Sequence, residues 1–292
     1  MKYRMLALSF AAASLFASPA WAQTKDIQLY ASAVNAKGEP VKGLGPSDFQ
    51  VREDGVAREV LKAAPATEPL TIAVLVDDSQ ASSRSIQMIR EGVQNFMTSL
   101  AGKAGISLTT FGERPTIVTP YTTDQKTLMD GVKHIFPRPG SGAYLLEAIH
   151  DVSNGLEKRH PARPVIVVLM VEDREFSNLY YQQVLDSVDK SGATLDVVAL
   201  GQPIGPISDE NRNRDLVVAQ GTERTGGLRD QVLAMSGIPG QMTLLASQLA
   251  DQYAITYARP EQLIPPKTIA VTATKPGVTV HARTRTAQAG AR

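Results

Sequence analysis

Acidic and hydroxyl side chains follow an apolar run in the stretch TIAVLVDDSQASSRSI, which covers residues 71–86. Asp77, Asp78 and Ser79 come directly after the apolar residues, and Ser82 follows within the same stretch. Carboxylate and hydroxyl oxygens are the ligands that hard cations such as Mg²⁺ and Ca²⁺ prefer. They are also groups that a protein partner can contact at the end of a strand.

Similar side chains occur at two other places in the chain. Glu172 and Asp173 follow the apolar run VIVVLMV, and Ser141 lies in the glycine-rich stretch PGSGA. Ligands of open α/β sheets bind outside the carboxyl ends of the parallel strands. We therefore expect one partner-binding face at that edge. Its predicted members are Asp77, Asp78, Ser79, Ser82, Ser141, Glu172 and Asp173.

The segments that must position these side chains alternate between apolar runs and amphipathic stretches. Strands are predicted at 71–76, 106–112, 164–171 and 193–201. Helices are predicted at 82–101, 123–136, 145–159 and 178–192, and a further helical stretch ends near Asp251. Continuous apolar strands between amphipathic helices indicate a parallel sheet covered on both faces. The fold class is therefore α/β, with a doubly wound, mostly parallel sheet. The polar stretch 208–215 is expected to be part of a long loop.

The two ends of the chain have the alternating pattern of half-buried strands instead. A strand is predicted at 27–35, a hairpin at 48–63 with Asp54 and Gly55 as its turn, and further strands between 253 and 285. These strands are most economically each other's partners, so they predict a small β module. The predicted division is a signal peptide at 1–22, an N-terminal β segment at 23–68, an α/β domain at 69–250, C-terminal strands at 251–285 and a tail at 286–292.

The first residues have the pattern of a secretory signal. Lys2 and Arg4 precede an apolar run from Met5 to Phe16, and the small-residue stretch ASPAWA predicts cleavage after Ala22. The apolar run is short for a membrane span, and no later segment approaches the required length. We expect a periplasmic or secreted protein without membrane insertion.

Composition argues against several functional classes. The formal net charge is +1 with both signs scattered along the chain, so nucleic acid is not an expected partner. Ser141 lacks the spacing of a nucleophile elbow, the histidines are far apart, and no phosphate loop or dinucleotide fingerprint is present. We therefore expect no enzyme activity. An unrecognised hydrolase is the alternative from another functional class.

Motifs at both ends carry a resemblance to a known family. They are VKGLGPSDFQVREDG at 41–55, YAITYARP at 253–260 and KPGVTVHAR at 275–283. With these motifs the chain resembles the bacterial proteins related to the von Willebrand factor type A (VWA) domain, whose fold is Rossmann-like. The resemblance implies an exported module that binds another protein.

The resemblance also implies a metal-ion-dependent adhesion site, in which a D-x-S-x-S motif, a Thr and a further Asp hold Mg²⁺ or a similar ion. Asp77 and Ser79 match the first two positions, whereas Ala81, Ala143 and Val171 stand at the others. The implied site is therefore degenerate, and no metal is expected. Any residual site would use Asp77 and Ser79.

Two further interpretations of the same residues stay open. A shifted ligand set with Ser82, Ser141 and Glu172 would give a metal-dependent adhesion module, and weak Mg²⁺ or Ca²⁺ binding is possible. In the metal-free interpretation, Asp77 and Ser79 are expected to cap a helix that starts near Ser82 or Ser83.

Overall fold

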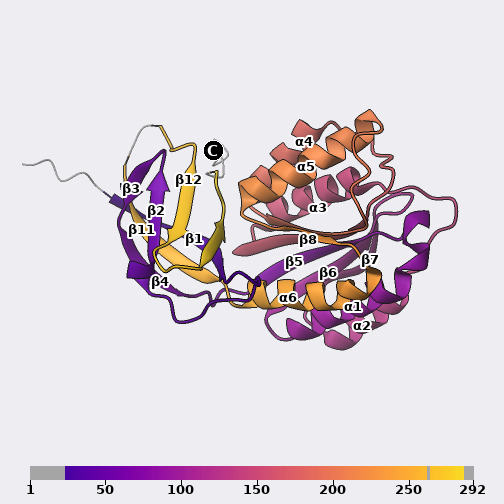
Figure 1. Ribbon diagram of the computed structural model, residues 1–292, viewed down its shortest axis with the longest axis horizontal. Helices are drawn as coiled ribbons and strands as arrows, with labels where there is room; N and C mark the ends of the chain where they lie inside the picture. The colour runs from indigo at the N-terminus through magenta and orange to yellow at the C-terminus, as the bar shows by residue number, and fades with distance from the viewer. Residues whose placement is uncertain (1–23, 262–263, 286–292) are drawn as a thin grey trace, which may run out of the picture.

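The computed structural model describes residues 24–261 and 264–285. The predicted signal peptide at 1–22 and the tail at 286–292 lie outside the described residues. Figure 1 shows two parts, a β module with strands from both ends of the chain and an α/β domain with helices on both faces of its sheet. Among the described residues, no helix combines the length and apolar character needed to cross a membrane.

The sheet of the α/β domain has the strand order β10-β9-β8-β5-β6-β7. Its strands are β5 (Leu70–Val76), β6 (Ala104–Thr110), β7 (Thr116–Thr122), β8 (Arg163–Val171), β9 (Thr194–Leu200) and β10 (Arg229–Val232). All neighbours are parallel except β7, which is antiparallel to β6. The predicted fold class, a doubly wound and mostly parallel α/β sheet, is confirmed.

The sequence analysis missed both edge strands. β7 contains the exposed Pro120, and its register against β6 shifts along the pair. β10 buries only Val232. Edge strands need one buried face at most, and proline is tolerated there, so neither segment has the continuous apolar pattern of a central strand.

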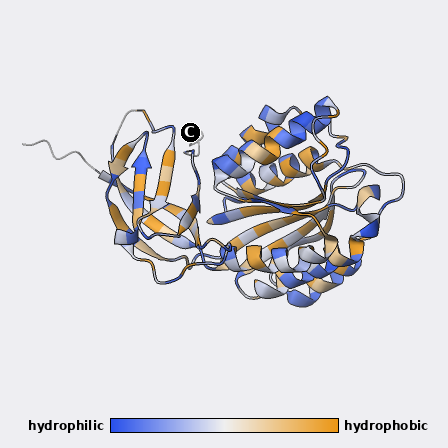
Figure 2. Cartoon of the chain, viewed as in Figure 1, coloured by the Kyte–Doolittle hydropathy of each residue, from blue (hydrophilic) through white to orange (hydrophobic). Residues whose placement is uncertain are grey.

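Helices cover both faces of this sheet (Figure 1). One face carries α1 (Ile86–Ser99), α2 (Gln125–Lys133) and α6 (Ile238–Ala250), and the other carries α3 (Leu145–Arg159), α4 (Tyr181–Ser191) and α5 (Asp209–Thr225). Side chains of β5 alternate between the two cores, with Val74 on the α1 side and Leu75 on the α3 side. Figure 2 shows mixed hydropathy on the helices, as expected for elements with one face on the sheet and one in solvent.

The prediction of a loop over 208–215 is wrong, because this stretch begins α5. Ser208 is the N-cap residue, and its hydroxyl accepts a hydrogen bond from the Asn211 backbone N–H at 3.2 Å. Asp209 and Glu210 lie in the first turn, where negative charge interacts favourably with the helix dipole. The polar residues are therefore a helix start signal rather than a sign of a loop.

The β module consists of two antiparallel sheets. The first has the order β13-β1-β11-β4, and the second has the order β12-β2-β3. Their strands are β1 (Thr24–Val34), β2 (Phe49–Glu53), β3 (Val56–Arg58), β4 (Val60–Pro65), β11 (Tyr253–Pro260), β12 (Ile269–Ala273) and β13 (Thr279–Ala282). Asp54 and Gly55 form the predicted turn, both with positive φ. Strands from both ends pair with each other, while the exact domain limits stay a prediction.

Two tyrosines of β11 bind the N-terminal segment of this module. The Tyr253 hydroxyl donates to the Val41 carbonyl at 2.9 Å and accepts from the Leu44 N–H at 3.2 Å. The Tyr257 hydroxyl donates to the Glu53 carboxylate at 2.7 Å. The motif residues that carry the family resemblance at the two ends of the chain therefore bind one another.

Deleting residues 253–292 is expected to abolish the amide protection of β1 and β2. Without these residues β1 loses both neighbours, β11 and β13, and β2 loses β12. A two-stranded hairpin is only marginally stable in water, so β2 and β3 would not persist alone. Hydrogen exchange measured by mass spectrometry tests this. Full protection of residues 49–53 in the truncated chain would contradict the shared module.

Candidate functional site

The carboxyl ends of β5, β6 and β8 meet a loop that precedes α3. Asp77, Asp78 and Ser79 follow β5 directly. The Ser141 carbonyl accepts from the Gln80 N–H at 3.3 Å, and Ala143 forms bridges to Gly112 and Glu175. The structure therefore places the predicted aspartates and Ser141 at one edge of the sheet, as parallel strands require.

Asp77 is fully buried and binds only groups of the chain. Its Oδ1 accepts from the Ser79 N–H at 2.8 Å, and its Oδ2 accepts from the Val171 N–H at 3.1 Å. Burial raises the pKa of Asp77, the hydrogen bonds from Ser79 and Val171 lower it, and the charge of Asp78 raises it, with a net rise. Val171 stands at a family ligand position and contributes its backbone N–H. Asp77 therefore links β5 to the end of β8.

Asp78 is also buried and has a cationic partner. Its Oδ1 accepts from the Gly112 N–H at 2.6 Å, and its Oδ2 forms an ion pair with Arg138 Nε at 2.8 Å. The hydrogen bond from Asp78 raises the pKa of Arg138. Arg138 also lies 3.5 Å from the Glu113 carboxylate. The sequence analysis missed Arg138, because no motif points to a lone arginine in a loop.

The serines of the predicted site bond to backbone carbonyls. The Ser82 hydroxyl donates to the Ser79 carbonyl at 2.8 Å, and the Ser141 hydroxyl donates to the Arg138 carbonyl at 2.9 Å. The predicted capping role is wrong. A 3₁₀ helix at Gln80–Arg84 separates Ser79 from α1, which begins at Ile86, and Ser79 makes no side-chain capping bond. The Ser82 contact stabilises the turn between β5 and α1, and the Ser141 contact stabilises the loop before α3.

Glu172 and Asp173 differ in exposure. The Glu172 carboxylate is buried and forms ion pairs with Arg214 at 3.1 Å and Arg229 at 3.3 Å. Arg214 also donates to the Asp173 carbonyl at 2.6 Å, while Asp173 itself is exposed. Of the predicted partner-binding residues, five have buried side chains that cannot contact a partner directly. They are Asp77, Asp78, Ser79, Ser82 and Glu172.

Glu175 is a buried acid that sequence reasoning did not single out. Its Oε1 accepts from the Leu145 N–H at 2.9 Å, at the start of α3, and from the Ser177 hydroxyl. Burial raises the pKa of Glu175 to about 7. Its Oε2 is buried and has no hydrogen-bond partner, which suits a protonated carboxyl group. Glu175 therefore positions the loop that runs through Ala143.

Stability is expected to fall as the pH rises from about 4.5 to about 7, through the contribution of Glu175. In that window the folded state holds a proton that the unfolded state has released. The free energy of unfolding therefore falls as the pH rises. The contribution amounts to about 3 kcal/mol across the window. Urea unfolding at pH 5 and pH 8 tests this. Between these two pH values, Glu175→Gln should lose less free energy of unfolding than the parent chain. Asp151→Asn, at an exposed position of α3, is the control. An unchanged slope in Glu175→Gln would contradict the protonated Glu175.

The donor set does not fit the metal site that the family resemblance implies. Ala81, Ala143 and Val171 offer no side-chain oxygen, and both oxygens of Asp77 already accept backbone N–H groups. Within residues 24–261 and 264–285, no group of three or more His, Cys, Asp or Glu side chains is placed to hold a metal ion.

Comparisons with known proteins agree with this architecture. Residues 72–173 match the family model of the von Willebrand factor type A domain. A comparison with curated protein sequences gave no match.

Solved structures show the same fold at low sequence identity. A von Willebrand factor type A protein from Catenulispora acidiphila has a TM-score of 0.53 at 12% identity, over 85% of this chain and 76% of that one. Proximal thread matrix protein 1 from the mussel byssus, with a zinc-occupied adhesion motif, has a TM-score of 0.54 at 10% identity, over 68% of this chain. The matched region spans half the length of the mussel protein.

Proposed function

We propose a function from the premise that residues 72–173 form a von Willebrand factor type A domain. The chain is an exported, non-enzymatic module, and it binds another protein without a divalent metal ion. Domains of this family are commonly protein-interaction modules. One observation carries the metal-independent part of the proposal. Both oxygens of Asp77 and both oxygens of Asp78 accept hydrogen bonds from the chain itself.

A cation at this edge would have to displace existing contacts. Mg²⁺ gives up its water reluctantly and needs several oxygens in octahedral geometry. Here Asp77 holds the end of β8, and the Arg138 guanidinium already supplies positive charge to Asp78. A second positive charge beside Arg138 would be repelled. Arg138 thus takes the electrostatic role that a bound cation would otherwise have.

The surface proposed to contact a partner consists of the loops around the buried aspartates. The Glu113 N–H donates to the Gly142 carbonyl at 2.8 Å, the Arg138 N–H to the Asp78 carbonyl at 2.8 Å, and the Phe176 N–H to the Ala143 carbonyl at 2.9 Å. These bonds join loops from different strand ends into one surface. Phe176 and Tyr180 are exposed beside it and offer aromatic contact area, which is enriched in protein interfaces. Export is supported by the signal pattern in residues 1–22.

Replacing a chelator by millimolar Mg²⁺ is expected to leave the melting temperature unchanged. A ligand of the folded state present at 100 times its dissociation constant would add about 2.7 kcal/mol and raise the melting temperature clearly. A variant with Ala81→Ser, Ala143→Thr, Val171→Asp and Arg138→Gln restores the oxygens and removes the competing charge. We expect that variant alone to respond to Mg²⁺ in differential scanning fluorimetry.

Partner capture tests the same proposal at the level of function. Immobilised chain should retain the same exported protein in chelator and in Mg²⁺, and Phe176→Asp should reduce retention. Chelator-sensitive stabilisation of the parent chain, abolished by Asp77→Ala, would instead establish the metal-dependent alternative. Retention of nothing in either buffer would count against a protein-binding role.

A further inference from the structure

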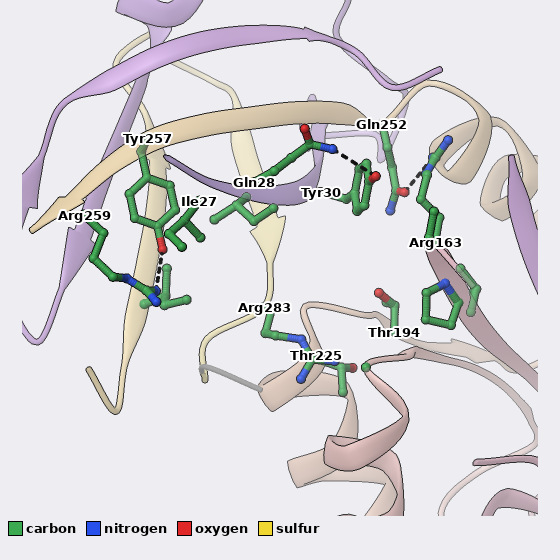
Figure 3. A pocket seen from close by; sticks show the side chains of 16 residues that line it. Ile27, Gln28, Tyr30, Arg163, Thr194, Thr225, Gln252, Tyr257, Arg259 and Arg283 are labelled. Atoms are coloured by element: carbon green, nitrogen blue, oxygen red, sulfur yellow. Dashed lines mark hydrogen bonds between the residues drawn. The ribbon is translucent and has the colours of Figure 1, made fainter. Parts of the chain in front are cut away.

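A pocket of about 330 Å³ lies between the β module and the α/β domain (Figure 3). Its walls come from β1 and β11 of the module and from the amino ends of β8 and β9, where Arg163 and Thr194 begin the strands. Asp77 follows the carboxyl end of β5, which is parallel to β8. The pocket therefore lies at the opposite edge of the sheet from the candidate site and is independent of the proposed function.

The charge of the lining is positive and uncompensated within the pocket. Arg163, Arg259 and Arg283 line it, and none of the lining residues is Asp or Glu. In the view of Figure 3, Arg283 lies between Arg259 on one side and Arg163 on the other. Arg259 has a partner in Glu53, at 2.6 Å from its Nε. The other two arginines have no carboxylate among their hydrogen-bond partners.

The acid whose charge acts on Arg283, Asp189, also interacts with other arginines. Burial raises the pKa of Asp189, and the charges of Arg283, Arg224 and Arg285 lower it, with a net rise. One carboxylate thus faces several guanidinium groups, and it does not line the pocket. Burial also lowers the pKa of Arg283, which reflects the cost of a desolvated cation.

Hydrogen-bond donors also remain unused. Arg283 Nη2 donates to the Ala193 carbonyl at 3.1 Å, whereas its Nη1 is buried and has no partner. Arg163 donates through both Nη atoms, but its Nε is buried and unpartnered. Buried donors are almost always satisfied in folded proteins, and an oxyanion is the strongest acceptor for a guanidinium.

Part of the lining is apolar. Ile27 and Leu29 come from β1, Val165 from β8 and Ile269 from β12. Pockets for small molecules combine such apolar walls with a few polar groups that fix orientation, and this volume lies within their usual range. We propose that the pocket binds a small organic anion, whose carboxylate or phosphate group pairs with Arg283 and whose apolar body packs against Ile27, Val165 and Ile269.

Isothermal titration calorimetry of the full chain with phenyl phosphate, phenylacetate and inorganic phosphate tests this inference. At least one of the two aromatic anions should bind ten times more tightly than inorganic phosphate, because the ring contacts the apolar wall. The aromatic anion that binds more tightly identifies the head group. Arg283→Gln should raise its dissociation constant at least tenfold. Arg212→Gln makes the same change in charge at an exposed position of α5 and should change the dissociation constant less than twofold.

Hydrogen exchange of the unmodified chain gives a readout that does not depend on a variant's folding. The bound aromatic anion should slow exchange in residues 192–195 and 279–285, which surround Arg283 and its acceptor Ala193. Absence of binding by all three anions would overturn the inference. The inference would also be overturned if inorganic phosphate bound as tightly as the aromatic anions, or if Arg283→Gln and Arg212→Gln lost the same affinity. Unchanged amide exchange around Arg283 on addition of the anion would overturn it as well.

Discussion

Gly226→Ala is expected to lower the free energy of unfolding by about 3 kcal/mol or more, the largest effect of any single methyl group that we predict. Gly226 ends α5 with φ +73°, a conformation that costs an L-residue about 1–2 kcal/mol. A Cβ at this position would also lie within 2.5 Å of the Arg283 backbone nitrogen and would overlap the Ala282 carbonyl group. The clash is with backbone, so no side-chain rotation relieves it.

Gly102→Ala is the matched control for the backbone conformation. Gly102 has the same φ of +73°, but a Cβ there would meet nothing within 4 Å. Urea unfolding of both variants separates conformational strain from the contact between α5 and the end of β13. Equal losses of stability in the two variants would contradict the tight contact at Gly226.

Glu53→Ala is expected to destabilise the chain by about 3–5 kcal/mol, because it leaves two half-buried arginines and a buried tyrosine hydroxyl without their common acceptor. The Glu53 carboxylate is fully buried and accepts from Arg58 at 2.9 Å, from the Tyr257 hydroxyl at 2.7 Å and from Arg259. Burial raises the pKa of Glu53, but the hydrogen bonds from Arg259, Tyr257 and Arg58 lower it more, so its net pKa lies below the ordinary value. Its stabilising contribution is therefore complete above about pH 4.5 and is lost as the pH falls further.

Glu59→Ala removes a carboxylate at an exposed position nearby and should change stability by less than about 0.5 kcal/mol. Chemical unfolding at pH 7 compares the two variants directly. A Glu53→Ala chain as stable as Glu59→Ala would show that the ion pairs of the β module contribute little.

The central strands could be predicted because burial on both faces leaves a continuous apolar run. β8 is the clearest case, since VIVVLMV has no polar residue to suggest another structure. Edge strands and the first turns of helices were harder to predict from the sequence. β10 buries a single valine. The first turns of α5 are polar because their acidic residues interact with the helix dipole, while the buried Asn211 and Arg214 donate to the Asp173 carbonyl after β8. Composition alone does not separate such a helix start from a loop.

The candidate site was predictable in position but not in its contacts. Asp77 and Asp78 lie where a strand end in an α/β sheet predicts them. Their partners are backbone N–H groups of Ser79, Val171 and Gly112, and every residue type except proline supplies such a group. Arg138 comes from a loop whose path depends on the whole fold. The sequence therefore indicated where these aspartates lie but not which groups bind them.

The chain crosses between the β module and the α/β domain at two neighbouring places. Ala66, before β5, donates its N–H to the carbonyl of Gln252, after α6, at 2.8 Å, and Arg163 donates to the carbonyls of both Glu68 and Leu249. The loops proposed to hold a partner lie at the far ends of the same parallel strands (Figure 1). Tension between a captured partner and an anchored β module would run lengthwise through β5, and would load its hydrogen bonds to β6 and β8 together in shear rather than one at a time.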